Sequence, residues 1–119
     1  VGLRDGLIVA SGWMLHGTVY ATELARTIVV PEGEYYSCRW YVRPDYRGRH
    51  LIGCLLHSFA VEVAKPGDRL WALIYPWNKP SWRSVEAIGW RRSGEMGTTW
   101  LLGRPIARHR RAKFTPIVL

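Results

Sequence analysis

The segment from Trp40 to Leu56 constrains the fold most, because its character changes twice within a short stretch. An aromatic and β-branched run is stopped by Pro44, and an apolar run with helical spacing begins at Leu51. The turn between them carries Arg43, Arg47, Gly48 and Arg49. This order predicts a strand, a basic turn and a helix. Since a helix start offers unpaired N–H groups and the positive end of the helix dipole, we expect the turn to bind an anion such as a diphosphate.

The same turn resembles the acetyl-CoA-binding signature of the GNAT N-acetyltransferase superfamily, whose core motif runs Arg/Gln-x-x-Gly-x-Gly/Ala. The resemblance rests on Val42-x-Pro44-x-Tyr46-Arg47-Gly48-Arg49, followed by Leu55-Leu56. Arg47 occupies the first motif position, whereas His50 and Ile52 stand at the two glycine positions and Gly53 comes one residue late. Glycines there let phosphates approach a backbone without Cβ atoms. His50 would partly compensate by donating a hydrogen bond to a phosphate.

A second match to the family follows at the expected distance along the chain. Asn78-x-x-Ser81 and then Ile88-Gly89-Trp90 resemble the family's Asn-x-x-Ala/Ser and Leu-Gly-Phe motifs. Two motifs in the right order are a stronger indication than a basic turn alone, which is commonly just solvated. The resemblance covers about half of the chain, from Gly33 to Trp90.

The resemblance implies a binding site for acetyl-CoA, the cosubstrate, between two splayed parallel strands. The backbone of Tyr41 and Val42 would pair with the pantetheine arm, and Asn78 with Ser81 would contact it from the other side. The pyrophosphate would be held by Arg47, Gly48, Arg49, His50, Leu51, Ile52 and Gly53. A primary amine would then attack the thioester directly in a ternary complex.

Such a transfer needs a proton acceptor for the amine and, in many relatives, an acid for the thiolate. The family commonly places a Tyr seven residues after the Asn, and here that position is Val85. Ser84 is the neighbouring hydroxyl, although an ordinary helix residue explains it equally well. Candidate bases by position are Glu34, Tyr36 and Tyr75. The sequence leaves the catalytic residues unassigned.

The pattern along the chain predicts one α/β domain over residues 1–119, with a mixed central β-sheet flanked by helices. We expect strands from Leu7, within Thr18–Val30, over Tyr35–Val42 and over Arg69–Tyr75, with a bulge or break at Gly12. Helices are expected over Leu51–Ala64, with Leu51, Leu55, Phe59 and Val63 as its apolar stripe, and over Ser81–Ile88 with Gly89 as its C-cap. A closing hairpin is expected from Trp90–Arg92 and Thr98–Leu102 around Ser93-Gly94-Glu95.

This order lacks the family's first strand and N-terminal helices. The chain begins with Val1 rather than Met, and we expect it to be part of a longer protein. An incomplete sheet exposes an edge and an apolar face, which favours self-association such as a homodimer. No apolar stretch reaches membrane-spanning length and no signal peptide is apparent, so we expect a cytoplasmic protein without a membrane partner.

The formal net charge of +8 lies entirely in the second half of the chain, where residues 65–119 hold eleven Lys/Arg against three Asp/Glu. A C-terminal cluster combines Arg104, Arg108, His109, Arg110, Arg111 and Lys113. This cluster is suited to binding nucleic acid, an acidic partner or a cofactor phosphate, and a solvated basic tail explains it equally well. Two further functions therefore stay open beside the enzyme: a catalytically degenerate acyl-CoA-binding or interaction module, and a basic domain for nucleic acid or an acidic partner.

The two cysteines, Cys38 and Cys54, sit in apolar settings and are expected to be small core residues. The four histidines show no ligand spacing with them, so no metal site is predicted.

Overall fold

The computed structural model describes the backbone of residues 1–111, and the side chains of residues 1–98, 102–104 and 106. Within this range the chain forms two α-helices, two 3-10 helices and eight strands. The strands are β1 (Gly2–Arg4), β2 (Leu7–Leu15), β3 (Gly17–Ala21), β4 (Arg26–Val30), β5 (Glu34–Val42), β6 (Arg69–Trp71), β7 (Gly94–Leu101) and β8 (Arg104–Arg111). The helices are η1 (Thr22–Leu24), η2 (Pro44–Tyr46), α1 (Leu51–Glu62) and α2 (Lys79–Glu86).

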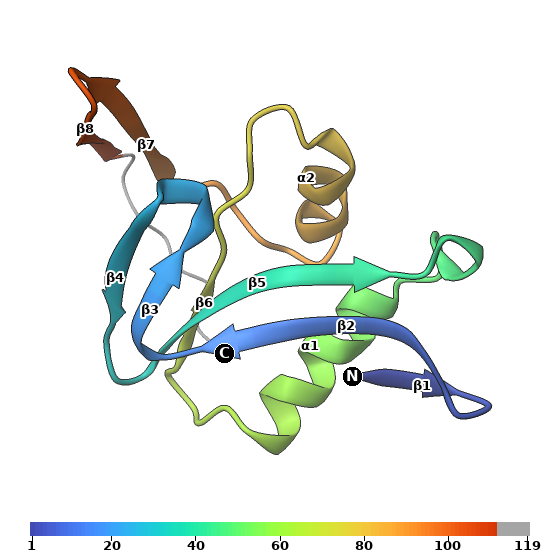
Figure 1. Ribbon diagram of the computed structural model, residues 1–119. Helices are drawn as coiled ribbons and strands as arrows, with labels where there is room; N and C mark the ends of the chain where they lie inside the picture. The colour runs from blue at the N-terminus through green and yellow to red at the C-terminus, as the bar shows by residue number, and fades with distance from the viewer. Residues whose placement is uncertain (112–119) are drawn as a thin grey trace.

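The central sheet is mixed and has the strand order β1-β2-β5-β6. β2 is antiparallel to both β1 and β5, whereas β5 and β6 run parallel. The link between these parallel strands is α1, which packs against one face of the sheet (Figure 1). The predicted strand–helix–strand unit and the mixed α/β class are therefore confirmed.

A hairpin that stands between β2 and β5 in the chain partly covers the other face of the sheet. β3 and β4 form this separate antiparallel pair, which joins the two central strands (Figure 1). Tyr36 and Cys38 of β5 are buried with Ala21, Leu24 and Val30 of the hairpin region. This cluster is the main core, and it confirms that Cys38 is a small core residue.

The predicted break at Gly12 is a register shift in the pairing of β2 with β5, between Ser11 and Trp13. The indole ring of Trp40 lies directly over Gly12, and a Cβ atom added there would stand 2.5 Å from that ring. The Trp40 side chain also donates a 2.6 Å hydrogen bond from Nε1 to Ser37 Oγ. Gly12 is thus required by a close approach of a large side chain.

The apolar stripe of α1 is only partly as expected. Phe59 packs edge-on against Tyr35, with ring centroids 4.9 Å apart, and Leu55 lies near Gly2 and Ala10. The most buried residue, however, is Leu56, which the stripe did not include. The helix ends at Glu62 rather than Ala64, so Val63 follows it and is 56% exposed. Cys54 is exposed as well, and its prediction as a core residue is wrong.

The second half of the chain departs furthest from the sequence prediction. β6 ends at Trp71 instead of Tyr75, and α2 spans Lys79–Glu86 instead of Ser81–Ile88. Gly89 does close α2, with a φ of +90° and a hydrogen bond from Trp90 N–H to the Val85 carbonyl.

The predicted C-terminal hairpin has the wrong turn. The turn is Leu102-Gly103, where φ is +49° and +74°, and Gly94 opens strand β7 instead. Two adjacent positive φ values between paired residues are typical of the two-residue turns that suit twisted strands. The basic residues Arg104, Arg108, Arg110 and Arg111 belong to β8, while Lys113 lies outside the described residues.

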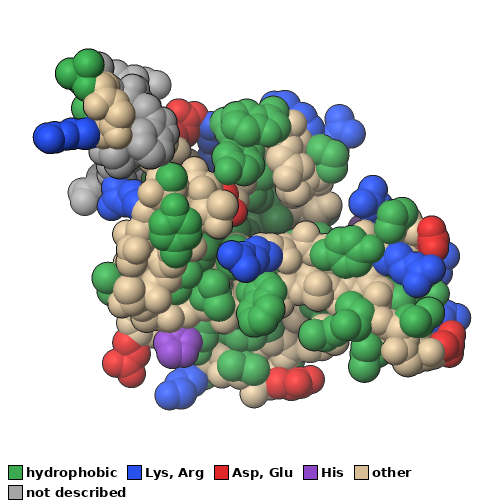
Figure 2. All heavy atoms as spheres, viewed as in Figure 1, with side chains coloured by type: hydrophobic (Ala, Val, Ile, Leu, Met, Phe, Trp, Pro, Cys, Tyr) green, Lys and Arg blue, Asp and Glu red, His purple; other side chains and the backbone are tan. Residues whose placement is uncertain are grey.

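Apolar side chains remain exposed on the face of the sheet turned away from α1. Figure 2, viewed as Figure 1, shows them gathered over β2 and β5. The exposed residues of these two strands include Trp13 at 58% and Tyr41 at 50%. No helix among the described residues is long and apolar enough to cross a membrane.

Candidate functional site

The parallel strands β5 and β6 separate after only three residue pairs. Glu34, Tyr35 and Tyr36 pair with Arg69, Leu70 and Trp71, and beyond that point β5 continues to Val42 without β6 beside it. Arg39 has a φ of +51°, a conformation that an L-residue adopts at a cost and that bends a strand locally. Between Ser37 and Val42, one edge of β5 therefore has no strand partner among the described residues.

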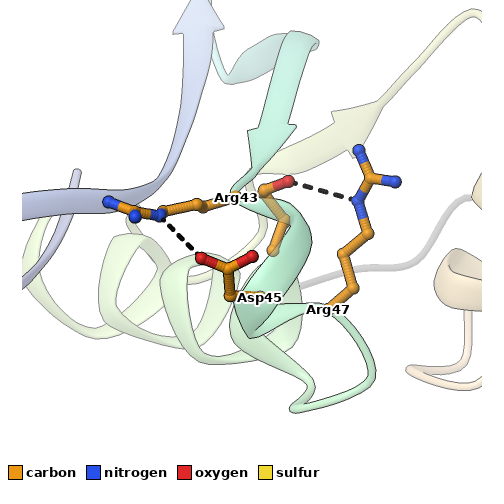
Figure 3. Close-up of polar contacts among 4 residues, drawn as sticks. Arg43, Asp45 and Arg47 are labelled. Atoms are coloured by element: carbon orange, nitrogen blue, oxygen red, sulfur yellow. Dashed lines mark hydrogen bonds and ion pairs between the residues drawn. The ribbon is translucent and has the colours of Figure 1, made fainter.

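The basic turn lies at the end of this free edge. Arg43 Nε is 3.2 Å from Asp45 Oδ2, and Arg47 Nε donates to the Val42 carbonyl oxygen at 3.3 Å (Figure 3). Figure 3 shows the guanidinium groups of Arg43 and Arg47 on opposite sides of the chain. Arg49 stacks on Tyr46, with 5.0 Å from its guanidinium carbon to the ring centroid. The three arginines share the turn but do not converge on one point.

The first turn of α1 offers backbone donors beside these arginines. The earliest hydrogen bond at this end runs from Cys54 N–H to the His50 carbonyl, and no side chain caps the helix. The N–H groups of Leu51, Ile52 and Gly53 consequently have no intrahelical acceptor. His50 precedes them with a φ of +55° and is exposed, as are Arg47, Gly48 and Arg49. This end of α1 suits an anion.

Gly53 has a packing role beside the phosphate contact that the resemblance implies. A Cβ atom at Gly53 would lie 3.1 Å from Cγ2 of Ile88, so its small size permits the close contact between α1 and the segment after α2. Ile52 occupies the motif position where the family has glycine. Gly48 of the basic turn has a φ of +73°, and phosphate binding by these residues stays a prediction.

Asn78 and Ser81 are brought together at the start of α2. The Oδ1 atom of Asn78 accepts a 3.3 Å hydrogen bond from the Ser81 backbone N–H, so Asn78 is the N-cap of this helix. Asn78 is exposed and Ser81 is half-buried. Their position after the separating end of β6 matches the order that the sequence predicts, while contact with a pantetheine arm stays a prediction.

The candidate proton-transfer residues are occupied by other interactions. Ser84 Oγ donates to the Pro80 carbonyl at 3.0 Å, as an ordinary helical serine does. Glu34 forms a 3.5 Å ion pair with Arg69 across the parallel pair of strands. Tyr75 stacks on Trp77 with ring centroids 4.6 Å apart, and it is 40% exposed.

Tyr36 is buried, and its hydroxyl donates a 2.6 Å hydrogen bond to Glu23 Oε2. Burial, and then the carboxylate of Glu23, raise the pKa of Tyr36 well above its usual value, so Tyr36 stays protonated near neutral pH. Burial also raises the pKa of the neighbouring Cys38 thiol. The sequence reasoning missed Glu23, whose only signal is a carboxylate within the β-branched segment Thr18–Val30.

An open pocket of about 110 Å³ lies along β6, α2 and residues 90–94. Three tryptophans line it, namely Trp71, Trp82 and Trp90, and Val85 of α2 is also part of its wall. None of the residues of the basic turn contributes to it. This pocket is therefore separate from the basic turn, although the candidate base Glu34 is part of its wall.

Among the described residues, no group of three or more His, Cys, Asp or Glu side chains is placed to hold a metal ion. Comparison with protein-family models, curated proteins and solved structures gives no match to this chain.

Proposed function

We propose that the chain is a GNAT-like N-acetyltransferase that transfers an acetyl group from acetyl-CoA to a primary amine. The observation that carries this proposal is the edge of β5 from Ser37 to Val42, which has no strand partner among the described residues and leads through the basic turn into the uncapped start of α1. A free strand edge and an anion-binding helix start are the two features that a pantetheine arm and a pyrophosphate require. Their order along the chain supports the resemblance of the Arg47 and Asn78 motifs to the family.

The residues of the turn fit the phosphates of acetyl-CoA. Leu51, Ile52 and Gly53 would donate backbone N–H groups, and Arg47 and Arg49 would supply charge from exposed positions. Among the described residues, Arg47 is held only by a neutral carbonyl, so its guanidinium is able to turn toward an anion at little cost. The side chains of His50 and Ile52 restrict how closely the phosphates can approach the backbone, so we expect moderate affinity for acetyl-CoA.

The free edge of β5 would orient the thioester beside the incoming amine. When bound, acetyl-CoA supplies an activated acetyl group on a thiol leaving group of ordinary acidity. The backbone of this edge at Tyr41 and Val42 would hold the pantetheine arm, and an N–H donor on the edge would stabilise charge on the carbonyl oxygen. Water would take the proton that the ammonium must lose before it attacks. With Val85 at the usual Tyr position, water would also protonate the departing sulfur, so turnover is expected to be low.

A second candidate function is an acyl-CoA-binding module without catalytic activity. It is favoured by the hydrogen bonds that occupy Ser84 and Tyr36, because neither hydroxyl is free to transfer a proton. This module would bind acetyl-CoA at the same turn but would not acetylate amines.

Calorimetry with acetyl-CoA tests the site that both candidates share. Arg47→Glu places a carboxylate beside the pyrophosphate, and we expect affinity to fall tenfold or more, about 1.4 kcal/mol. Arg26→Glu is the matched control, since Arg26 is exposed at the start of β4. Equal affinity in the Arg47 variant and the parent would remove the basic turn from the proposal.

Two further measurements separate the functions. Acetylation of a panel of primary amines distinguishes the enzyme from the inactive module, which would bind acetyl-CoA without turnover. Thermal shifts with acetyl-CoA, CoA and short RNA distinguish both from a nucleic-acid-binding domain, because a ligand that binds only the native state raises its apparent stability. A shift with RNA alone would replace the acyl-CoA proposal with the third function.

A further inference from the structure

Glu23 is placed at the point where β5 and β6 separate, although it comes from the distant η1 segment. Its Oε2 atom accepts the 2.6 Å hydrogen bond from Tyr36, which belongs to the last pair of residues that join the two strands. Tyr36 is 1% exposed, so its hydroxyl lies in the protein interior and holds the Glu23 carboxylate in position through this hydrogen bond. Glu23 itself is half-buried, and solvent or a ligand therefore has access to it.

The carboxylate has no cationic neighbour among the described side chains. The ion pairs found there join Arg4 with Asp5, Arg43 with Asp45, Arg69 with Glu34 and Arg92 with Glu95. Among the described side chains, the carboxylate has one neutral donor and no ion-pair partner, and it can accept further hydrogen bonds. The chain has a formal net charge of +8, so a carboxylate without an ion-pair partner among the described side chains is a distinctive feature of it.

Aromatic rings lie near Tyr36, the hydrogen-bond donor to the carboxylate. Tyr36 packs on Trp71 with ring centroids 4.9 Å apart, and Tyr75 stacks on Trp77. Tyr75 lies close enough to Tyr36 to contribute to the raised pKa of its hydroxyl. Ring faces attract cations, and a carboxylate beside them adds a charged acceptor for N–H donors. Together these groups suit a small organic cation.

We propose that the Glu23 carboxylate, held in place by the Tyr36 hydroxyl, binds the primary ammonium group of the acceptor amine. This inference rests on the proposed function, because it places the amine beside the free edge of β5. It also defines the substrate class as amines that are cationic at neutral pH. Glu23 acts here as a binding and specificity-determining residue, and Tyr36 positions it.

The test is a nuclear magnetic resonance titration of the full chain with Nα-acetyl-lysine amide, a cationic primary amine. The matched ligand is the same compound acetylated at its side-chain nitrogen, which has no charge. We expect the parent to bind the first ligand and not the second. Glu23→Gln keeps the shape and an acceptor for Tyr36 but removes the charge, and it should weaken binding roughly tenfold or more.

Two variants separate binding from structural effects. Glu23→Asp retains the charge and should restore part of the affinity, whereas Glu32→Gln changes an exposed turn residue and should leave the titration unchanged. Equal affinity of the parent and Glu23→Gln, no binding by the parent, or equal binding of the two ligands would each overturn the assignment.

Calorimetry with acetyl-CoA on the same samples keeps the two proposals apart. The Glu23 variants should bind acetyl-CoA like the parent, because the basic turn is intact in them. If the parent does not bind acetyl-CoA, the proposed function alone is contradicted. If the parent and the Glu23 variants bind the amine equally, this inference alone is contradicted.

Discussion

The three arginines of the basic turn differ in how firmly they are held. Arg43 is paired with Asp45, whereas Arg47 meets only a neutral carbonyl and Arg49 lies over a tyrosine ring. An anion would have to compete with a carboxylate for Arg43 but not for the other two. At the scale of single residues, Arg47 and Arg49 are therefore the side chains that distinguish this turn from a solvated one.

Ser84 should contribute little to catalysis. Its hydroxyl is exposed and donates to a backbone carbonyl, so Ser84→Ala should lower turnover less than tenfold, about 1.4 kcal/mol in the barrier. Val85→Tyr should raise turnover if the new hydroxyl reaches the sulfur. Steady-state kinetics with acetyl-CoA measure both effects. A hundredfold loss in Ser84→Ala, with acetyl-CoA binding intact, would identify Ser84 as the acid.

Tyr36 should make folding stability sensitive to alkaline pH. Its pKa is raised above the usual 10.0 by burial and by Glu23, so the folded chain keeps a proton that the unfolded chain loses above about pH 10. The free energy of unfolding should then fall with rising pH, by up to about 1.4 kcal/mol per pH unit from this group. Denaturant unfolding between pH 8 and pH 11 measures the slope.

Tyr36→Phe should reduce this alkaline slope, and Tyr20→Phe, which changes an exposed residue, is the control. A slope in the Tyr36 variant equal to that of the parent would show that the buried hydroxyl is not its source.

At the scale of elements, the sequence predicted what local patterns determine and failed where tertiary contacts decide. The strand ending at Val42, the basic turn and the start of α1 at Leu51 follow from Pro44, the arginines and the apolar spacing. The early end of β6 could not be predicted, because Leu73 and Ile74 favour a strand, whereas the pairing with β5 stops at Trp71.

The candidate site also combines residues that local sequence patterns predict with one that only tertiary contacts bring into place. The turn residues were found because charge and glycine are visible in a sequence. Glu23 was not, since it reaches Tyr36 across 13 residues through the β3–β4 hairpin. The C-terminal turn was misplaced because Gly94 and Gly103 are equally good turn signals, and the pairing of β7 with β8 selects the second.

The packing of Trp40 on Gly12 should be essential for the β2–β5 pair. Gly12→Ala introduces a Cβ atom 2.5 Å from the indole ring, so Trp40 must move and its hydrogen bond to Ser37 is weakened. We expect a loss of about 2 kcal/mol in the free energy of unfolding. Gly97→Ala in β7 is the control, because no atom of the described residues lies within 4 Å of the added Cβ. Equal stability of the two variants in denaturant would disprove this packing role.

At the scale of the whole molecule, the sheet is covered unevenly. α1 covers one face, the β3–β4 hairpin covers part of the other, and Trp13 and Tyr41 remain exposed. β1 pairs with only the first residues of β2, so the outer edge of β2 from Ser11 onward has no partner in residues 1–111. The sheet therefore has an unpaired edge and a partly uncovered face within the described residues, while the absence of a first strand of the family stays a prediction.

The chain should self-associate through this uncovered face. Light scattering at increasing concentration should report species larger than the monomer, and Trp13→Lys should shift them toward the monomer by at least a few-fold in dissociation constant. Val61→Lys on α1 is a control, since Val61 is 70% exposed on another element. A monomer at every concentration would contradict the expectation.

The most direct test of the central proposal is to map acetyl-CoA onto the backbone by nuclear magnetic resonance. The proposal predicts that amide shifts concentrate at Leu51, Ile52 and Gly53 of α1 and along residues 38–42 of β5, where the N–H groups lack partners within the helix or β6. Shifts confined to the separate pocket beside Trp82 and Trp90, or no shifts at saturating acetyl-CoA, would contradict it.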